Sequence, residues 1–327
     1  MGITIRLIGL WATALCVGLL AASAEAEDIL VAQWGHSLAG ANMAVALEQG
    51  LFAKAGANVS GVVAAQGGGA GVRTVLAADN KSTLGYAVVS LTAAVAAIER
   101  GEDLRIVNEG ARTTADIVLF TKKDSPLATI KDLKGKSVGI TTPLGFSDMI
   151  VTLVVKRAEL PLESVKRVSL GSVSGALAGL DNGVVDVSHL LEPEWTMKKA
   201  NYKLIFHGRD LPRMVQSVGV ATKSLIDQYP DKVRAIVKAH GLAVQAIKSN
   251  PELSAKNIHK YYDRVPLDTL TSVIKDLAEA DHWSEGGFDV PAMDRMLDSL
   301  RAIGAFKGDV DWAKTLDGRF LDASKKS

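Results

Sequence analysis

The chain has 327 residues, a length that suits two lobes or one large α/β domain and is too long for one small core. Hydrophobic residues make up 48% and charged residues 22%, so disorder over most of the chain is excluded. With 37 Lys and Arg against 36 Asp and Glu, the chain has no basic excess, and we expect no nucleic-acid partner. The one cysteine, Cys16, excludes an intrachain disulfide and a cysteine-based zinc site.

Residues 1–26 have the pattern of a secretory signal peptide. Arg6 precedes an apolar run over 7–22, and small residues follow the run at the positions that a signal peptidase requires. We prefer cleavage after Ala26, although cleavage after Ala24 fits the same rule. The alternative is an uncleaved membrane anchor. The pattern therefore predicts an exported protein.

Strands and helices alternate in the first part of the remaining chain. Strands are expected over 28–33, 58–65, 83–89 and 104–108. Helices are expected over 41–49, 71–78 and 91–100. Regular alternation with short loops predicts a parallel sheet with helices on both faces.

A second series of strands and helices begins near residue 117. Its expected strands cover 117–121, 137–141, 166–170, 184–188 and 202–206, and its expected helices cover 147–158 and 175–180. A strand over 215–221 then returns to the first lobe. The tail reads as helices over 231–249, 253–262, 267–280, 292–303 and 312–321, with prolines near several starts. Two lobes linked by crossings near 112–117 and 213–217 predict a cleft between them.

Motifs for catalysis are incomplete. Gly171–Gly175 resembles a nucleophile elbow, but its centre is Val173. The glycine-rich stretch 67–74 is not a P-loop, and Thr74 stands where a dinucleotide fingerprint needs a third glycine. The pair His189 and Glu192 fits either a metal site or the polar lining of a pocket. Because no nucleophile, base and orienting group come together, we expect no enzyme, no metal and no cofactor.

Loops rich in glycine or hydroxyl groups follow several strands and precede helices. They are 34–37, 66–69, Ser90 and 141–147. In a parallel sheet such loops lie at the carboxyl ends of the strands, where ligands bind, and helix starts offer unpaired N–H groups. Each loop alone fits an ordinary turn or helix cap, but several loops from two lobes favour ligand capture.

Four segments carry a resemblance to a known family. They are 47–56, 133–140, 180–187 followed by Glu192-Pro193, and 229–233. In this order and spacing they resemble the periplasmic solute-binding proteins of ABC transporters, in the nitrate/sulfonate/taurine and thiamine-precursor branch. The resemblance runs from about residue 28 to 321. Segment 133–140 is fairly specific to type II binding proteins.

The resemblance implies a type II periplasmic binding protein fold of class α/β. Two doubly wound sheets would be joined by two hinge crossings and followed by a helical C-terminal tail. Lobe 1 would comprise 27–114 and 215–327, and lobe 2 would comprise 115–214. The ligand would contact Trp34, His36, Gln66, Gly68, Gly69 and Ser90 from lobe 1, Thr114 near the hinge, and Thr141, Phe146, Ser147, His189 and Glu192 from lobe 2.

Departures from the family pattern bear on the ligand. Phe146 adds a bulky apolar contact, and the ligand loops contain no arginine except at their edges, where Arg73 and Arg112 stand. An organic acid, a sulfonate or a heteroaromatic compound is therefore favoured over nitrate. Trp34 fits a core position as well, His36 a solvated loop, and Glu192 a brace of the hinge.

The resemblance implies that a monomer in the periplasm closes on a small molecule and delivers it to an inner-membrane ABC permease. One alternative is an exported binding protein that feeds a sensor or another type of transporter. A second is an enzyme like those that make the thiamine pyrimidine. The export signal over 1–26 speaks against the enzyme, because the enzymes of that branch have none.

Overall fold

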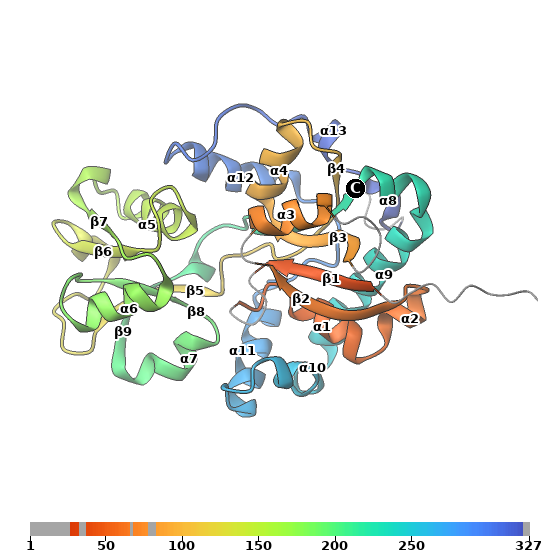
Figure 1. Ribbon diagram of the computed structural model, residues 1–327. Coiled ribbons are helices and arrows are strands. Elements are labelled where there is room, and N and C mark those ends of the chain that lie inside the picture. The colour runs from red at the N-terminus through yellow and green to blue at the C-terminus, as the bar shows by residue number, and fades with distance from the viewer. Residues whose placement is uncertain (1–26, 33–36, 66–67, 78–82, 323–327) are drawn as a thin grey trace, which may run out of the picture.

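The structure of the protein is a computed structural model, which describes residues 27–32, 37–65, 68–77 and 83–322. The expected signal peptide, 1–26, lies outside the described residues. Two lobes are visible side by side in Figure 1, and the chain passes between them twice. No helix within the described residues is long and apolar enough to span a bilayer.

The sheet of lobe 1 has the strand order β2-β1-β3-β10-β4. Its strands are β1 (Glu27–Ala32), β2 (Val59–Ala65), β3 (Thr83–Ser90), β4 (Leu104–Glu109) and β10 (Ser217–Thr222). Strand β1 is parallel to β2 and β3, whereas β10 is antiparallel to both of its neighbours, β3 and β4. The four strands expected to be parallel therefore share one direction, and the returning strand is inserted between them in the opposite one.

Gly219 allows β10 to fit between β3 and β4. A Cβ atom at this position would lie 2.2 Å from Asn108 Oδ1 and 2.3 Å from the Tyr86 hydroxyl oxygen. Those two side chains are buried and hydrogen-bonded to each other at 3.0 Å. Only glycine leaves room for this pair against the strand.

In lobe 2 as well, a central strand runs antiparallel to both of its neighbours. Strand β5 (Ile117–Lys122) is antiparallel to β8 (Ser188–Leu191) and to β9 (Tyr202–His207), which flank it. The other pair, β6 (Ser137–Ile140) and β7 (Lys166–Ser169), is parallel and is joined to the β8 segment through a bridge between residues 138 and 187.

The expected strand over 184–188 is displaced towards the C-terminus. Val184 is exposed, and Gly183 has a φ of 73°, so the chain turns here before it can join the sheet. The Asp186 carboxylate accepts from the Ser137 backbone N–H at 2.8 Å and from the Ser137 hydroxyl at 2.7 Å. Strand β8 accordingly begins at residue 188.

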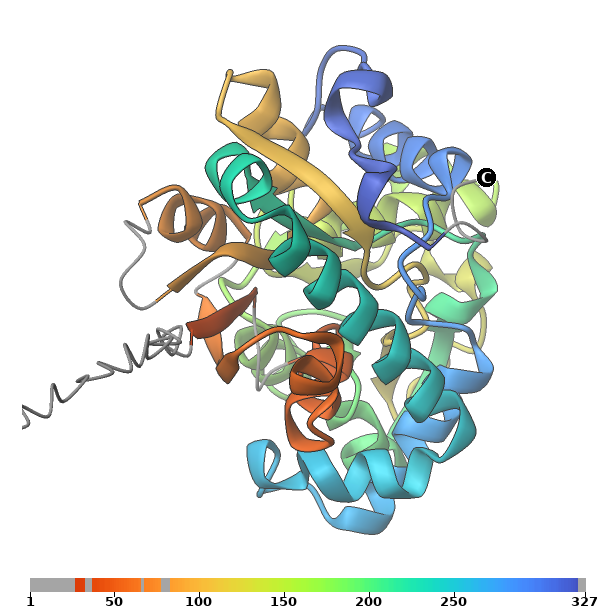
Figure 2. The ribbon, with the colours of Figure 1, turned by 90° about the vertical axis from the view of Figure 1, so that its right-hand side faces the viewer.

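Helices cover both faces of the first sheet. Helices α1 (Ala41–Glu48), α2 (Leu51–Ala55), α9 (Pro230–Ser249), α10 (Pro251–Ile258) and α11 (Leu267–Glu279) share one apolar core, and α9 runs along this side of the lobe in Figure 2. On the other face lie α3 (Gly68–Ala77), α4 (Leu91–Glu99) and α12 (Val290–Arg301). Helix α8 (Lys223–Gln228) follows β10.

The apolar core around α12 continues into lobe 2. It includes Met296 of α12 and Met149 of α5 (Phe146–Arg157). The remaining helices of lobe 2 are α6 (Val173–Asp181) and α7 (Glu194–Lys198), which pack on β8. Helix α12 therefore packs in the core of the first sheet and also contacts α5 of lobe 2.

Two expected helices of the tail are shorter than their sequences suggested. The helix expected over 253–262 ends at Ile258 and continues as one 3-10 turn. The helix expected over 312–321 was wrong beyond α13 (Trp312–Thr315). Leu316 is extended and forms a bridge with Ile106, and the Asp317 N–H donates to the Ile106 carbonyl at 2.8 Å, so the sheet edge captures this backbone.

The two crossings are hydrogen-bonded to each other. The Gly110 N–H donates to the Ser217 carbonyl, and the Gln216 N–H donates to the Ala111 carbonyl, each at 2.8 Å. The Ala111 N–H donates to the Ser217 hydroxyl oxygen, also at 2.8 Å. The chain therefore crosses between the lobes as a pair of tied segments.

Asp281 forms ion pairs with residues of both crossings. Its carboxylate pairs with Arg112, with Arg213 at 2.6 Å and with Lys248 at 2.8 Å. The pKa of Asp281 lies below its usual value because these hydrogen bonds and charges outweigh the effect of burial. Asp281 thus links the first crossing, the second crossing and α9.

Candidate functional site

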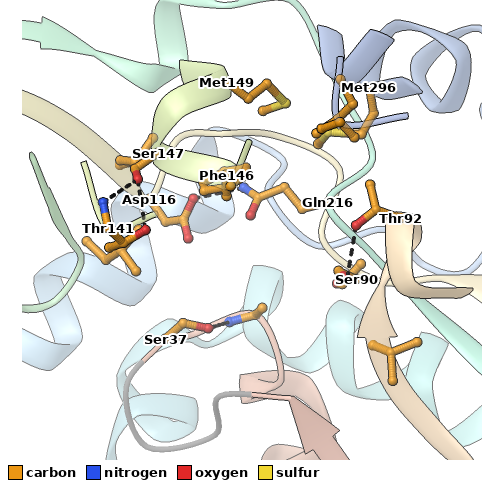
Figure 3. A pocket seen from close by; sticks show the side chains of 18 of the residues that line it. Ser37, Ser90, Thr92, Asp116, Thr141, Phe146, Ser147, Met149, Gln216 and Met296 are labelled. Carbon is orange, nitrogen blue, oxygen red and sulfur yellow. Dashed lines mark hydrogen bonds between the residues drawn. The ribbon is translucent and has the colours of Figure 1, made fainter. Parts of the chain in front are cut away.

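A cavity of about 450 Å³ lies between the two lobes. Residues from the ends of β3 and β6, from β8 and from both crossings line it, which is the position that the sequence predicted for a cleft. Most lining side chains are apolar, and a few polar groups stand among them (Figure 3). Such a combination is typical of sites for small organic molecules.

The rim from lobe 2 is the loop after β6 and the start of α5. Ser147 is buried, and its hydroxyl oxygen accepts from the Thr141 backbone N–H at 2.9 Å. The Thr141 and Ser147 hydroxyl oxygens are also 2.9 Å apart and share a hydrogen bond (Figure 3). These bonds hold the loop against the first turn of α5, so the rim is preorganised.

The start of α5 already holds a negative charge. Asp148, in the first turn, accepts from the Leu144 N–H at 2.9 Å and lies 2.8 Å from the guanidinium of Arg167. A carboxylate in this place interacts favourably with the positive end of the helix. The adjacent Leu144 has a φ of 60°, a conformation that non-glycine residues seldom adopt, and it lines the cavity.

The rim from lobe 1 is the start of α4. Ser90 ends β3 and is the N-cap of α4, because its hydroxyl oxygen accepts from the Ala93 N–H at 3.3 Å. The Thr92 hydroxyl donates to the Ser90 hydroxyl oxygen at 3.2 Å (Figure 3). Ser90 and Ser147 therefore line one cavity from different lobes.

The crossings supply the polar part of the cavity wall. Asp116 lies at the entry to lobe 2 and is only 3% exposed. The Gln216 side-chain amide donates to Asp116 Oδ1 at 2.9 Å and to the Thr113 carbonyl. Figure 3 places Asp116 and Gln216 side by side between the two rims.

His189 lies on β8 and is 2% exposed. Its Nδ1 is 3.0 Å from the Gly139 carbonyl oxygen, which can only accept, so Nδ1 carries the proton. Burial lowers the pKa of His189, and the ring is neutral at neutral pH. Nε2 therefore carries a lone pair and can accept a hydrogen bond.

The apolar part of the cavity comes from both lobes. Phe146 and Met149 of α5 face Met296 of α12 across it, and Phe306 follows α12 in the chain (Figure 3). Aromatic and thioether side chains adapt to flat or irregular apolar bodies. This wall suits an organic ligand.

The residues proposed from the sequence fall into three groups. Those that line the cavity are Ser90, Thr141, Phe146, Ser147 and His189. Trp34, His36 and Gln66 lie outside the described residues. Gly68 begins α3, and Gly69, in the same helix, is exposed and lies outside the lining of the cavity.

Thr114 and Glu192 have other partners and do not line the cavity. The Thr114 hydroxyl donates to the Gly208 carbonyl at 2.8 Å and ties the first crossing to lobe 2. The Glu192 carboxylate accepts from the Thr196 hydroxyl at 3.0 Å and from the Thr196 N–H at 3.2 Å, next to α7. His189 and Glu192 thus have separate hydrogen-bond partners. Within the described part of the chain, no group of three or more His, Cys, Asp or Glu is placed to hold a metal.

Sequence reasoning missed several lining residues. Asp116 and Gln216 stand in the crossings, where Thr114 was the one residue predicted to contact the ligand. Met296 and Phe306 belong to the tail, which gave no sign of reaching lobe 2. A buried charge in a predicted crossing is a signal that could have identified Asp116.

Comparison with known proteins agrees with this geometry. The family model described as "NMT1/THI5 like" matches residues 39–254. The chain belongs to the NMT1/THI5-like family. No curated protein matches it significantly by sequence.

Solved structures share the fold. The periplasmic aliphatic sulphonate binding protein SsuA from Escherichia coli has a TM-score of 0.72 at 16% identity, over 93% of this chain and 96% of that one. A putative sulfonate ABC transporter protein, the periplasmic sulfonate-binding protein SsuA from Methylobacillus flagellatus, has a TM-score of 0.68 at 18% identity, over 90% and 93%. The periplasmic nitrate-binding protein NrtA from Synechocystis has a TM-score of 0.58 at 14% identity, over 76% and 70%. The protein therefore has the fold of type II periplasmic binding proteins.

Proposed function

We propose that this protein is an extracytoplasmic solute-binding protein that captures one small organic molecule between its lobes and delivers it to an ABC-type permease. The observation that carries this proposal is the single cavity lined by Ser90 and Thr92 of lobe 1 and by Thr141 and Ser147 of lobe 2. A ligand that contacts both rims stabilises the closed arrangement only through contacts made there. Family membership and the fold of the similar structures support the same reading.

The proposal includes the finer points expected from the sequence. Residues 1–26 direct export to the periplasm and are then removed. Lobe 1 comprises 27–114 and 215–327, lobe 2 comprises 115–214, and the protein acts as a monomer without catalysis. A binding protein that serves a sensor would have the same cavity, and only the identity of the docking partner distinguishes the two.

Native mass spectrometry of freshly purified protein tests the capture step. We expect a monomer that carries one small molecule, and calorimetric titration with that molecule should give saturable heat. Ala96→Trp fills the cavity from α4 and should abolish binding, whereas Ala128→Trp, at an exposed position, is the matched control. Absence of saturable heat with every transportable solute tried would contradict the proposal.

A further inference from the structure

Asp116 is a buried carboxylate without a cationic partner among the described residues. It accepts one hydrogen bond, from the neutral Gln216 amide at 2.9 Å, and it lines the cavity. Its titratable neighbours include His207 and His282, and burial lowers the pKa of both, that of His207 to about 4. Both rings are therefore neutral at neutral pH. A buried carboxylate in such surroundings gains from a donor or a positive charge.

The described residues that line the cavity offer no cationic side chain to an anionic ligand. Among the described lining residues there is no Lys or Arg. Asp116 is the one acidic residue among the described lining residues.

Two further groups of the lining are acceptors. Nδ1–H of His189 is committed to the Gly139 carbonyl, which leaves the Nε2 lone pair. The Gln216 side-chain N–H groups are committed to Asp116 and Thr113, which leaves the Gln216 side-chain oxygen. The cavity lining thus adds acceptors to the carboxylate, one of them on Gln216 beside Asp116, and they match a ligand that is rich in N–H groups.

The N-terminal ends of α4 and α5 do not change the preference for a ligand that is rich in N–H groups. At the start of α5, Asp148 forms an ion pair with Arg167 at 2.8 Å, so this helix end already has a carboxylate partner and adds no unpaired cation to the cavity. The start of α4 is capped by the Ser90 hydroxyl. Phe146, Met149 and Met296 supply apolar surface to the same cavity (Figure 3).

We propose that the cavity selects a small organic molecule with a protonated or N–H-rich nitrogen group, held by Asp116, and an apolar or aromatic body held by the wall of Phe146, Met149 and Met296. The proposal rests on the proposed function, since it names the class of molecule captured. Of the organic acids, sulfonates and heteroaromatic compounds that the sequence favoured, it keeps the heteroaromatic compounds in amino-substituted form, and it adds amines and amidines. A compound whose one polar group is an anion meets Asp116 with like charge and is rejected.

Calorimetric titration of the full-length protein with matched pairs tests this selectivity. The probes are phenethylamine and benzamidine against phenylacetate and benzenesulfonate, within a wider set of small solutes sorted by charge. We expect the cations to bind and the anions not to bind. Asp116→Asn should weaken cation binding on the order of 10- to 100-fold, the loss of one charge-assisted hydrogen bond. Asp263→Asn removes the same charge at an exposed site outside the cavity lining and should leave affinity unchanged.

The outcomes separate the two proposals. Binding of anions in preference to cations, or cation binding that Asp116→Asn does not weaken, overturns the inference and leaves the proposed function standing. Absence of binding by any solute of any charge to folded protein contradicts the proposed function, and this inference falls with it. If Asp116→Asn does not fold, as judged by its melting curve, the preference of the wild-type protein between matched cations and anions decides alone.

Discussion

Replacement of Glu109 by glutamine should make the protein more stable at alkaline pH. Glu109 ends β4 next to the first crossing and is fully buried. Glu109 Oε1 accepts a hydrogen bond from the backbone N–H of Asp289, which is the N-cap of α12. Glu109 Oε2 has no hydrogen-bond partner among the described residues. Burial raises the pKa of Glu109 from 4.5 to about 7. The carboxyl group therefore anchors the helix that brings Met296 to the cavity, and burial favours its protonated form.

The sign of the effect follows from proton linkage. Between pH 4.5 and pH 7 the folded chain retains a proton that the unfolded chain has lost, so the free energy of unfolding decreases as the pH rises through this range. A difference of about 2.5 pKa units corresponds to about 3 kcal/mol above pH 7. Glutamine keeps the acceptor for the Asp289 N–H and cannot ionise. Relative to the wild-type protein, Glu109→Gln should gain about 3 kcal/mol between pH 4.5 and pH 8.

Urea denaturation at several pH values measures this difference directly. Other groups that titrate in the same range contribute equally to both proteins and cancel. Glu163→Gln, at an exposed position, is the control and should follow the wild-type curve. Parallel pH profiles for Glu109→Gln and the wild-type protein would refute the reasoning.

Three other substitutions test the supporting structure. In the wild-type protein, the free energy of unfolding should fall as the pH drops from 6.5 to 4, because the folded His207 ring binds fewer protons than the unfolded one. His207→Asn should reduce this loss of stability by about 1 kcal/mol. An unchanged pH dependence in urea denaturation would count against this. Asp281→Asn should cost about 1–2 kcal/mol and lose its effect at high salt, since three cations share this carboxylate; a salt-independent loss would exclude the ionic explanation. Gly219→Ala should cost more than about 3 kcal/mol in thermal unfolding, because its Cβ would overlap Asn108 and Tyr86, and a near-normal melting temperature would show that the strand can shift.

The order of elements was readable from the sequence because local patterns determine it. Hydrophobic runs such as 117–121 and the helical spacing of 231–249 each show their own secondary structure. Whether a strand runs parallel or antiparallel depends on the strand with which it pairs, and the local sequence does not specify that neighbour. The antiparallel placement of β10 between β3 and β4 was therefore out of reach, although Gly219 marks the close approach.

The candidate site likewise combines features that local sequence patterns predict with features that depend on distant segments. Loops after strands could be identified from glycine and hydroxyl content, and Ser90, Thr141 and Ser147 do border the cavity. Asp116 and Gln216 depend on how two crossings far apart in the chain lie against each other. Met296 reaches the cavity because α12 packs on α5, a contact between distant segments. Such long-range contacts decide which polar groups face a ligand.

Distance measurement between spin labels on the two lobes tests closure on a ligand most directly. The sequence has a single cysteine, so labels at Glu99→Cys in α4 and Lys156→Cys in α5 can be introduced after Cys16→Ser. On saturation with the tightest-binding solute of the charge-sorted set, the distance distribution should become shorter and narrower. An unchanged distribution at a concentration where calorimetry shows full occupancy would contradict capture between the lobes.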